Sequence, residues 1–149
     1  MLNRDFKEFA ELLNAHGVEY LVVGGYALAA HGHPRYTGDI DFWLSPPPGN
    51  IQAVLLALHD FGFASLGLTA ADFQPDTVVQ LGQPPRRIDL LTHIDGVQFD
   101  DCWPRRESVA LDGVVLPFIG LADFKANKLA SGRLKDLADL EALQMGPKT

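Results

Sequence analysis

Three aspartates have the spacing and setting to hold a metal ion. Asp39 and Asp41 flank the apolar Ile40, and Asp89 stands in a later apolar run. Side chains two positions apart on a strand project from one face, roughly 6.6 Å apart along it, so Asp39 and Asp41 can direct both carboxylates at one point. Such hard oxygen ligands suit Mg²⁺ or Mn²⁺. A divalent-metal site is predicted, and a solvated strand edge is the alternative, because an acidic chain produces Asp-x-Asp readily by chance.

The surroundings of Asp89 require a cation. This residue lies within the apolar run 88–91, where an unpaired carboxylate would be unfavourable to bury. A metal ion shared with Asp39 and Asp41 would supply the positive charge. A structural ion pair with Arg86 or Arg87 is the alternative source of that charge.

A pair of glycines stands where a phosphate could bind. Gly24 and Gly25 separate the apolar segment 20–23, predicted as a strand, from the helix-forming segment 26–30. Backbone N–H groups and the helix dipole at such a junction can receive a phosphate. A plain tight turn is the other interpretation.

The elements that must position these residues follow from periodicity and turn signals. Strands mixed with helices predict an α/β (α+β) fold in which a short mixed β-sheet is flanked by helices. Asp112 and Gly113 predict a hairpin, because glycine tolerates the positive φ of such turns. We expect a helix ending near Ala15, strands over 20–23, 39–44, 77–81, 87–91, 109–111 and 114–116, and helices over 26–30, 50–60, 121–130 and 134–143. The segments 77–81 and 87–91 are expected to pair.

Length and composition indicate one domain of ordinary size. The chain has 149 residues, of which 47% are hydrophobic and 21% are charged. We predict a single domain over 1–149, with a catalytic core over about 1–95 and a C-terminal hairpin and helices over about 96–149. A single cysteine, Cys102, allows no internal disulfide and no cysteine-based zinc cluster, which suits the cytoplasm. With no signal-peptide pattern and no membrane-spanning apolar run, a cytoplasmic protein without membrane contact is predicted.

The distribution of charge along the chain indicates which partners the protein can bind. A net charge of −7 argues against a broad nucleic-acid-coating surface. Because eight of the twelve Lys and Arg residues fall between Arg86 and Lys135, a polyphosphate should meet the later half of the chain. Lys125 and Lys128 fall within the apolar face of the predicted helix 121–130, so they are predicted to line a cleft, with snorkelling toward solvent as the alternative.

Two segments before the first acids are also of interest. Arg35 and Thr37 lie close enough to Asp39 to contact a nucleotide phosphate or to cap the loop. His31 and His33 are interpreted as loop residues rather than a metal pair, because further nearby ligands are missing.

The combined pattern resembles the DNA polymerase β-like nucleotidyltransferase superfamily. Val22-Val23-Gly24-Gly25, then Asp39-Ile40-Asp41, then Asp89 follow its order of apolar strand, glycine pair, Asp-x-Asp and later strand carboxylate. The segments 30–41 and 121–140 look like the small bacterial and archaeal group related to abortive-infection and minimal nucleotidyltransferase toxins and antitoxins. The resemblance implies that Asp39 and Asp41 hold two metals, that Asp89 shares one of them, and that Gly24 and Gly25 contact the triphosphate. Within this pattern a functional role is favoured for Arg35 and Thr37.

The resemblance also implies a reaction. A nucleoside monophosphate would pass from an NTP to a hydroxyl of a tRNA, a protein or a small molecule, with Mg²⁺ or Mn²⁺ as cofactor and pyrophosphate released. One alternative is a non-catalytic nucleotide-binding or partner-binding member of a toxin–antitoxin pair, facing a cognate toxin or antitoxin. Another is a structural protein with coincidental acids. Metal-dependent nucleotide binding separates the first two hypotheses from the third, and pyrophosphate release separates the first from the second.

Overall fold

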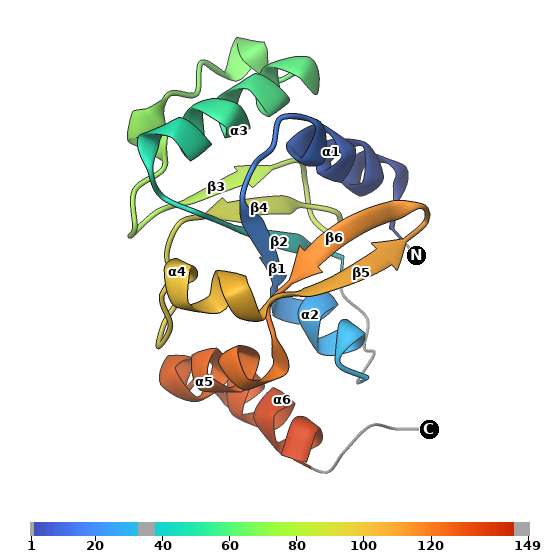
Figure 1. Ribbon diagram of the computed structural model, residues 1–149, viewed down its shortest axis with the longest axis vertical. Coiled ribbons are helices and arrows are strands. Elements are labelled where there is room, and N and C mark those ends of the chain that lie inside the picture. The colour runs from blue at the N-terminus through green and yellow to red at the C-terminus, as the bar shows by residue number, and fades with distance from the viewer. Residues whose placement is uncertain (1, 33–37, 145–149) are drawn as a thin grey trace.

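A six-stranded mixed sheet forms the centre of the protein in the computed structural model, which describes residues 2–32 and 38–144 (Figure 1). The strand order is β3-β4-β2-β1-β6-β5. β2 pairs with β4 and β1 with β6 in parallel, and the other neighbouring strands are antiparallel. The bounds are β1 Tyr20–Val23, β2 Ile40–Leu44, β3 Val78–Leu81, β4 Ile88–Leu91, β5 Glu107–Leu111 and β6 Val114–Phe118.

The helices agree closely with the sequence-based expectations. The α-helices are α1 Arg4–Ala15, α2 Gly24–Ala30, α3 Pro48–Asp60, α4 Phe99–Cys102, α5 Leu121–Ser131 and α6 Leu134–Gln144, and the 3₁₀ turns are η1 Ala64–Leu66, η2 Ala70–Asp72 and η3 Trp103–Arg105. α2 begins at Gly24 itself, two residues earlier than expected. The four-residue α4 was not predicted, because one turn is too short to show helical periodicity.

The predicted hairpin is confirmed. Asp112 and Gly113 have φ values of 51° and 83° between β5 and β6, the positive values that a tight two-residue turn requires. β3 and β4 also pair as expected.

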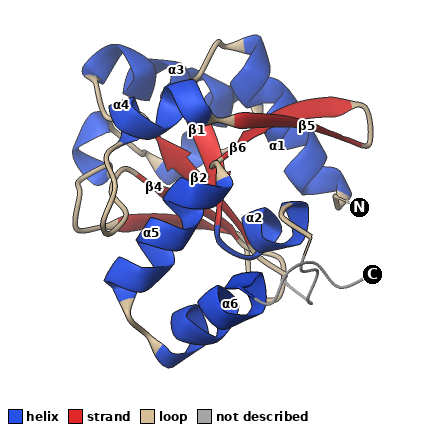
Figure 2. Ribbon diagram, turned by 60° about the horizontal axis from the view of Figure 1, so that its bottom comes forward, coloured by secondary structure: helices blue, strands red, loops and turns tan. Residues whose placement is uncertain are grey.

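Alternation along β2 decides which side of the sheet faces the functional residues. Phe42 packs edge-on against Phe9 of α1, and the next residue, Trp43, packs against Phe99 of α4. Successive side chains therefore point to opposite faces, as a strand requires. α1 and α3 lie on one side of the sheet, and α5 and α6 lie on the other (Figures 1 and 2). Asp41 shares the face of Trp43, so it points away from α1.

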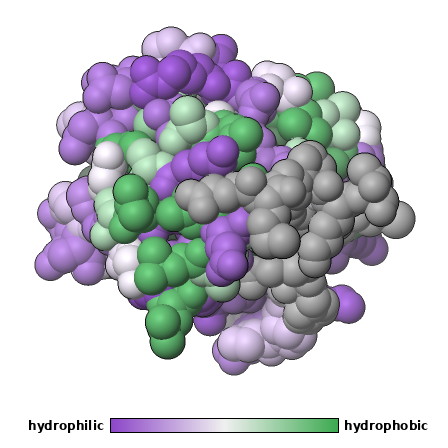
Figure 3. Space-filling view, turned by 90° about the horizontal axis from the view of Figure 1, so that it is seen from below, coloured by the Kyte–Doolittle hydropathy of each residue, from purple (hydrophilic) through white to green (hydrophobic). Residues whose placement is uncertain are grey.

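The surface formed by α5 and α6 carries hydrophobic side chains among polar ones. The view from below, over the end of the molecule where these helices lie, shows hydrophobic patches beside hydrophilic groups (Figure 3). Four exposed leucines belong to the two helices: Leu121, Leu129, Leu134 and Leu137.

No helix in the described part of the chain is long and apolar enough to cross a membrane.

Candidate functional site

Strand pairing brings two of the three predicted acids together. Asp41 on β2 and Asp89 on β4 are direct partners in the parallel register of these strands. Paired residues of neighbouring strands project from the same face, so the two carboxylates lie side by side. Ile40 and Phe42, on the other face, are fully buried as expected. Asp39 immediately precedes β2, and its carboxylate accepts a hydrogen bond from the backbone N–H of Arg87 at 3.0 Å.

The acids open into a cavity of about 580 Å³. Its floor includes Asp39, Asp41 and Asp89, which lie in or next to the sheet, together with Gly24 and Gly25 at the start of α2. The wall opposite this floor comes from the segment 93–95 and from the α5–α6 pair. The described lining residues from that wall are His93, Ile94, Asp95, Asn127, Lys128, Ser131, Arg133 and Lys135.

Arg87 is bound between two of the acids. Its Nε donates to Asp89 Oδ1 at 2.7 Å and its Nη2 donates to Asp89 Oδ2 at 3.1 Å, a bidentate pair. The same Nη2 lies 3.2 Å from Asp39 Oδ2. The ion pair considered as an alternative for Asp89 is therefore present, and Arg87 rather than Arg86 forms it.

The buried carboxyl of Asp41 is unfavourable to ionise. Burial, together with the charge and hydrogen bond of Asp89 and the charge of Asp39, raises the pKa of Asp41 to about 7, against the opposing effect of Lys135. The cluster therefore favours an additional positive charge beside Asp41.

Gly24 provides the space for Asp41. Its φ is 70°, a left-handed conformation that glycine adopts without strain. A Cβ at this position would overlap Asp41 Oδ2. The first glycine of the pair therefore lets the backbone approach the carboxylate closely, which a plain turn does not require.

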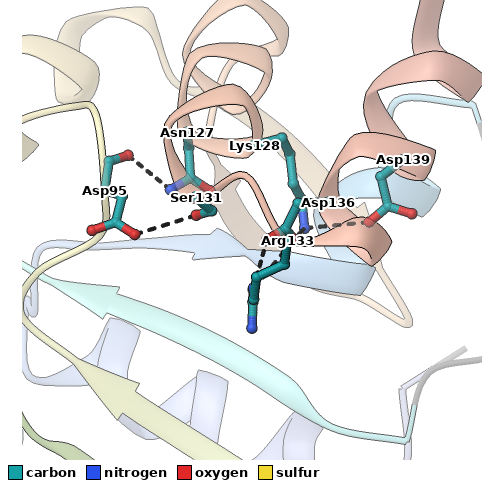
Figure 4. A network of polar contacts seen from close by, with 7 residues as sticks. All are labelled: Asp95, Asn127, Lys128, Ser131, Arg133, Asp136 and Asp139. Atoms are coloured by element: carbon teal, nitrogen blue, oxygen red, sulfur yellow. Dashed lines mark hydrogen bonds and ion pairs between the residues drawn. The ribbon is translucent and has the colours of Figure 1, made fainter.

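The two lysines predicted to line a cleft have different places. Lys125 is half-buried and is not among the residues that line the cavity. Lys128 does line it, but its Nζ lies 3.0 Å from Asp136 and 3.3 Å from Asp139 of α6 (Figure 4). The helical pattern placed both lysines on the inner face, but it could not show that α6 supplies buried carboxylates for Lys128.

The same network fixes the junction of α5 and α6. Arg133 donates to both oxygens of Asp136, at 2.6 and 3.2 Å. Burial alone would raise the pKa of the fully buried Asp136, but hydrogen bonds from Arg133 and Lys128 hold it below its usual value. Asp95 is tied to this wall as well, because Asn127 donates to its carbonyl oxygen at 2.9 Å (Figure 4).

One cavity cation was missed by the sequence reasoning. Lys135 lines the cavity and acts electrostatically on Asp41. Arg87, Lys128 and Arg133, the other cations of the described lining, are each paired with carboxylates. Among the described residues, no carboxylate lies within ion-pair distance of Lys135. The available signal was its place in Arg133-Leu134-Lys135-Asp136, within the segment 121–140 that carries the family resemblance.

Of the remaining residues considered from the sequence, one has a structural role and the others lie outside the described residues. His31 is a structural residue, since its ring contacts the carbonyl oxygen of Ile119 at 2.9 Å and lies 3.4 Å from Glu107. Arg35 and Thr37, predicted to contact nucleotide phosphate, lie outside the described residues, as does His33.

The donor set has the chemistry for Mg²⁺ or Mn²⁺. Asp39, Asp41 and Asp89 offer hard carboxylate oxygens to one cavity, and Gly24 leaves room for the carboxylate of Asp41. In the described part of the chain, no three His, Cys, Asp or Glu side chains are gathered as a ready set of metal ligands. The oxygens of Asp39 and Asp89 instead face Arg87.

Comparison with known proteins identifies the fold. No protein-family model and no curated protein matches the chain. The structure is similar to the crystal structure of a "putative nucleotidyltransferase" from Thermotoga maritima, with a TM-score of 0.64 and 15% sequence identity, over 97% of this chain and 96% of that chain. The predicted nucleotidyltransferase fold, with its short mixed sheet, flanking helices and C-terminal helical pair, is thereby confirmed.

Proposed function

We propose that this protein transfers a nucleoside monophosphate from an NTP to a hydroxyl group, releasing pyrophosphate. The observation that carries the proposal is the lining of one cavity. Asp39, Asp41 and Asp89 lie on one side of this cavity, and cations of the α5–α6 pair lie on the other. A triphosphate with its metal ions needs both, carboxylates for the metals and cations for the phosphates. The fold and the order of motifs further support membership of the DNA polymerase β-like superfamily, in its small abortive-infection or minimal group.

In this proposal each acid places a metal rather than attacking the substrate. Asp39 and Asp41 would hold the metal that accompanies the triphosphate, and Asp89 would help hold the second metal, which serves the acceptor hydroxyl. Metal ions bound there would supply polarisation of the α-phosphate, activation of the acceptor hydroxyl and stabilisation of the leaving pyrophosphate. No nucleophile on the protein is needed, because the acceptor hydroxyl attacks the phosphorus.

The phosphates are held by the backbone and by one lysine. Gly24 and Gly25 line the cavity beside Asp41, and the N-cap residue Val23 contributes no side-chain hydrogen bond to the start of α2. Backbone N–H groups there can donate to a phosphate. Lys135 supplies the positive charge, because its ammonium is not already committed to a carboxylate of the described residues.

The acceptor belongs to one of three classes: an RNA such as a tRNA 3′ end, a hydroxyl side chain of a partner protein, or a small molecule. A net charge of −7 weighs against a large nucleic-acid contact. A protein acceptor would suit a cognate toxin or antitoxin.

A second candidate is a non-catalytic nucleotide-binding or partner-binding protein. The specific observation in its favour is the bidentate pair of Arg87 with Asp89, which satisfies that acid without a metal. Such a protein would bind a nucleotide or partner without releasing pyrophosphate.

Two measurements test the proposal. Calorimetric titration of each NTP, with Mg²⁺ or with a chelator, should show binding only with the metal, because the carboxylates of Asp39, Asp41 and Asp89, which line one cavity, otherwise repel the triphosphate. Incubation with each labelled NTP, Mg²⁺ and host lysate should then transfer label to RNA, protein or a small molecule. Equal NTP affinity in chelator would contradict the metal assignment. Metal-dependent binding without pyrophosphate release would favour the non-catalytic alternative.

A further inference from the structure

Arg87 contacts every carboxylate oxygen of two proposed metal ligands. Its backbone N–H and Nη2 face the two oxygens of Asp39, at 3.0 and 3.2 Å. Its Nε and Nη2 donate to the two oxygens of Asp89, at 2.7 and 3.1 Å. A metal ion that takes an oxygen from each acid would bind atoms that Arg87 already contacts, so two cations would compete for the same two carboxylates.

The contacts of Arg87 with these acids are partly buried. The side chain is only 24% exposed, and the Asp89 side chain is 9% exposed, so water screens this contact less than a surface ion pair. Arg105 makes a similar bidentate pair with Asp123, but it is outside the cavity lining and contacts a single carboxylate. Arg87 differs because its guanidinium bridges two acids at the cavity floor.

We propose that Arg87 is an internal counter-ion that competes with the divalent metal for Asp39 and Asp89, and that metal binding releases its guanidinium to bind nucleotide phosphate. The inference rests on the proposed function, since it assumes that these acids hold a metal. Arg87 lines the cavity, so a released guanidinium remains beside the site where the triphosphate would lie. A planar fork that binds a carboxylate in bidentate fashion binds a phosphate in the same way.

This exchange would couple the two ligands. Metal alone must displace Arg87 and binds weakly. Metal together with nucleotide gives the displaced guanidinium a new anionic partner, so each ligand raises the affinity for the other. A purely structural Arg87 would have the opposite effect, because its removal would disorder Asp39 and Asp89 and weaken metal binding.

The test is calorimetric titration of Mn²⁺ into the nucleotide-free full chain. Arg87→Met should bind Mn²⁺ at least fivefold more tightly than wild type. Arg86→Met is the matched control, because Arg86 is the exposed neighbour outside the cavity lining, and it should stay within twofold. Lys135→Met removes a cavity charge without freeing a carboxylate oxygen, so it measures the effect of charge alone and should change Mn²⁺ affinity less than Arg87→Met.

A second titration examines the released guanidinium. With Mn²⁺ saturating, a non-hydrolysable NTP analogue should bind Arg87→Met at least fivefold more weakly than wild type. Unchanged or weaker Mn²⁺ affinity in Arg87→Met, or an equal gain in Lys135→Met, would overturn the proposal. Near-ultraviolet circular dichroism shows whether Arg87→Met is folded. If it is not, Arg87→Lys is used in its place: tighter Mn²⁺ binding than wild type would support the competition, and unchanged or weaker binding would contradict it.

Failure of the proposed function would look different. In that case neither wild type nor any variant would bind Mn²⁺, and no NTP would bind in a metal-dependent way. If wild type binds metal and NTP while Arg87→Met binds Mn²⁺ no better, only the role of Arg87 is wrong.

Discussion

Asp41 and Asp89 are direct partners across β2 and β4, which are adjacent in the sheet but not consecutive in the chain. This pairing places two carboxylates at one point of the cavity floor, while Asp39 reaches the same cavity from the residue before β2. The three acids can therefore be separated by the effect that each has on metal binding, nucleotide binding and chemistry.

Asp89→Asn should retain Mg-NTP affinity within about tenfold, roughly 1.4 kcal/mol, while transfer falls at least a hundredfold. The reason is that Asp89 would serve the metal that activates the acceptor, whereas Asp41 serves the metal of the triphosphate. Asp41→Asn should lose both binding and transfer. Calorimetry and a labelled-transfer assay measure the two effects, with Asp76→Asn, an exposed acid outside the cavity, as control.

A different result would assign Asp89 to structure. If Asp89→Asn unfolds while Asp39→Asn and Asp41→Asn stay folded and active, then the pair of Asp89 with Arg87 serves stability alone, and the assignment of the active site is wrong.

The metal-free protein should become less stable as the pH rises from about 4 to about 7. The unfolded Asp41 carboxyl ionises near its ordinary pKa of 3.8, but the folded one keeps its proton until about 7, chiefly because of burial. Ionisation within this window therefore opposes folding. In EDTA at pH 8, Asp41→Asn should melt at least about 3 °C above wild type, with a smaller difference at pH 5.

Added Mg²⁺ provides the control for that measurement, since it should raise the melting temperature of wild type at pH 8 and leave Asp41→Asn nearly unchanged. A constant difference between the two proteins from pH 5 to pH 8 would contradict the role of Asp41 ionisation.

Lys128→Met should destabilise the protein by about 3 kcal/mol, because it removes the cation that faces two buried carboxylates, Asp136 and Asp139. Arg133 remains to pair with Asp136 and limits the loss. Urea denaturation measures the change in the free energy of unfolding. Lys125→Met, on the same helix but outside the cavity lining, should change it by less than about 0.5 kcal/mol. Equal stability of the two variants would show that the Lys128 cluster contributes little.

Lys135→Met should weaken Mg-NTP binding at least fivefold and leave the melting temperature within about 2 °C. Lys135 is exposed and has no carboxylate partner among the described residues, so its loss leaves no buried charge unpaired. Calorimetry with Mg-NTP gives the affinity, and Lys125→Met serves again as the comparison. An unchanged affinity would remove Lys135 from the proposed phosphate site.

Gly24→Ala should both destabilise the fold and weaken Mn²⁺ binding, because the new Cβ would be strained at φ 70° and would overlap Asp41 Oδ2. Gly62→Ala is the matched control: Gly62 has φ 96° and open space around the position of a Cβ. The Gly62→Ala variant should lose about 1 kcal/mol of the free energy of unfolding through backbone strain, and its Mn²⁺ affinity should stay the same. Equal Mn²⁺ affinity in the two variants would show that Gly24 serves the backbone alone.

The sequence by itself determined the elements and the polarity of their faces. Strand alternation placed Ile40 and Phe42 in the core and Asp41 on the opposite face, and Asp112 with Gly113 specified the hairpin. These features depend on local backbone geometry, whose periods of 2.0 and 3.6 residues can be seen in the order of residue types. The glycine pair and the acids could be found for the same reason, since each lies at a recognisable junction or strand.

Only the tertiary structure decided which charges meet. The sequence left a metal ion, or an ion pair with Arg86 or Arg87, as partner for Asp89; strand alternation puts Arg87 on the face of Asp89, and the pairing of β4 with β2 brings the same guanidinium to Asp39. Helical spacing turned Lys128 inward, but the carboxylates that bind it belong to α6, while Lys135 reaches the cavity from beyond the Gly132 break. Ion pairs between different elements form where long-range packing brings charged groups within a few ångströms, and their strength depends on burial, so the residue order of one helix or strand cannot specify them.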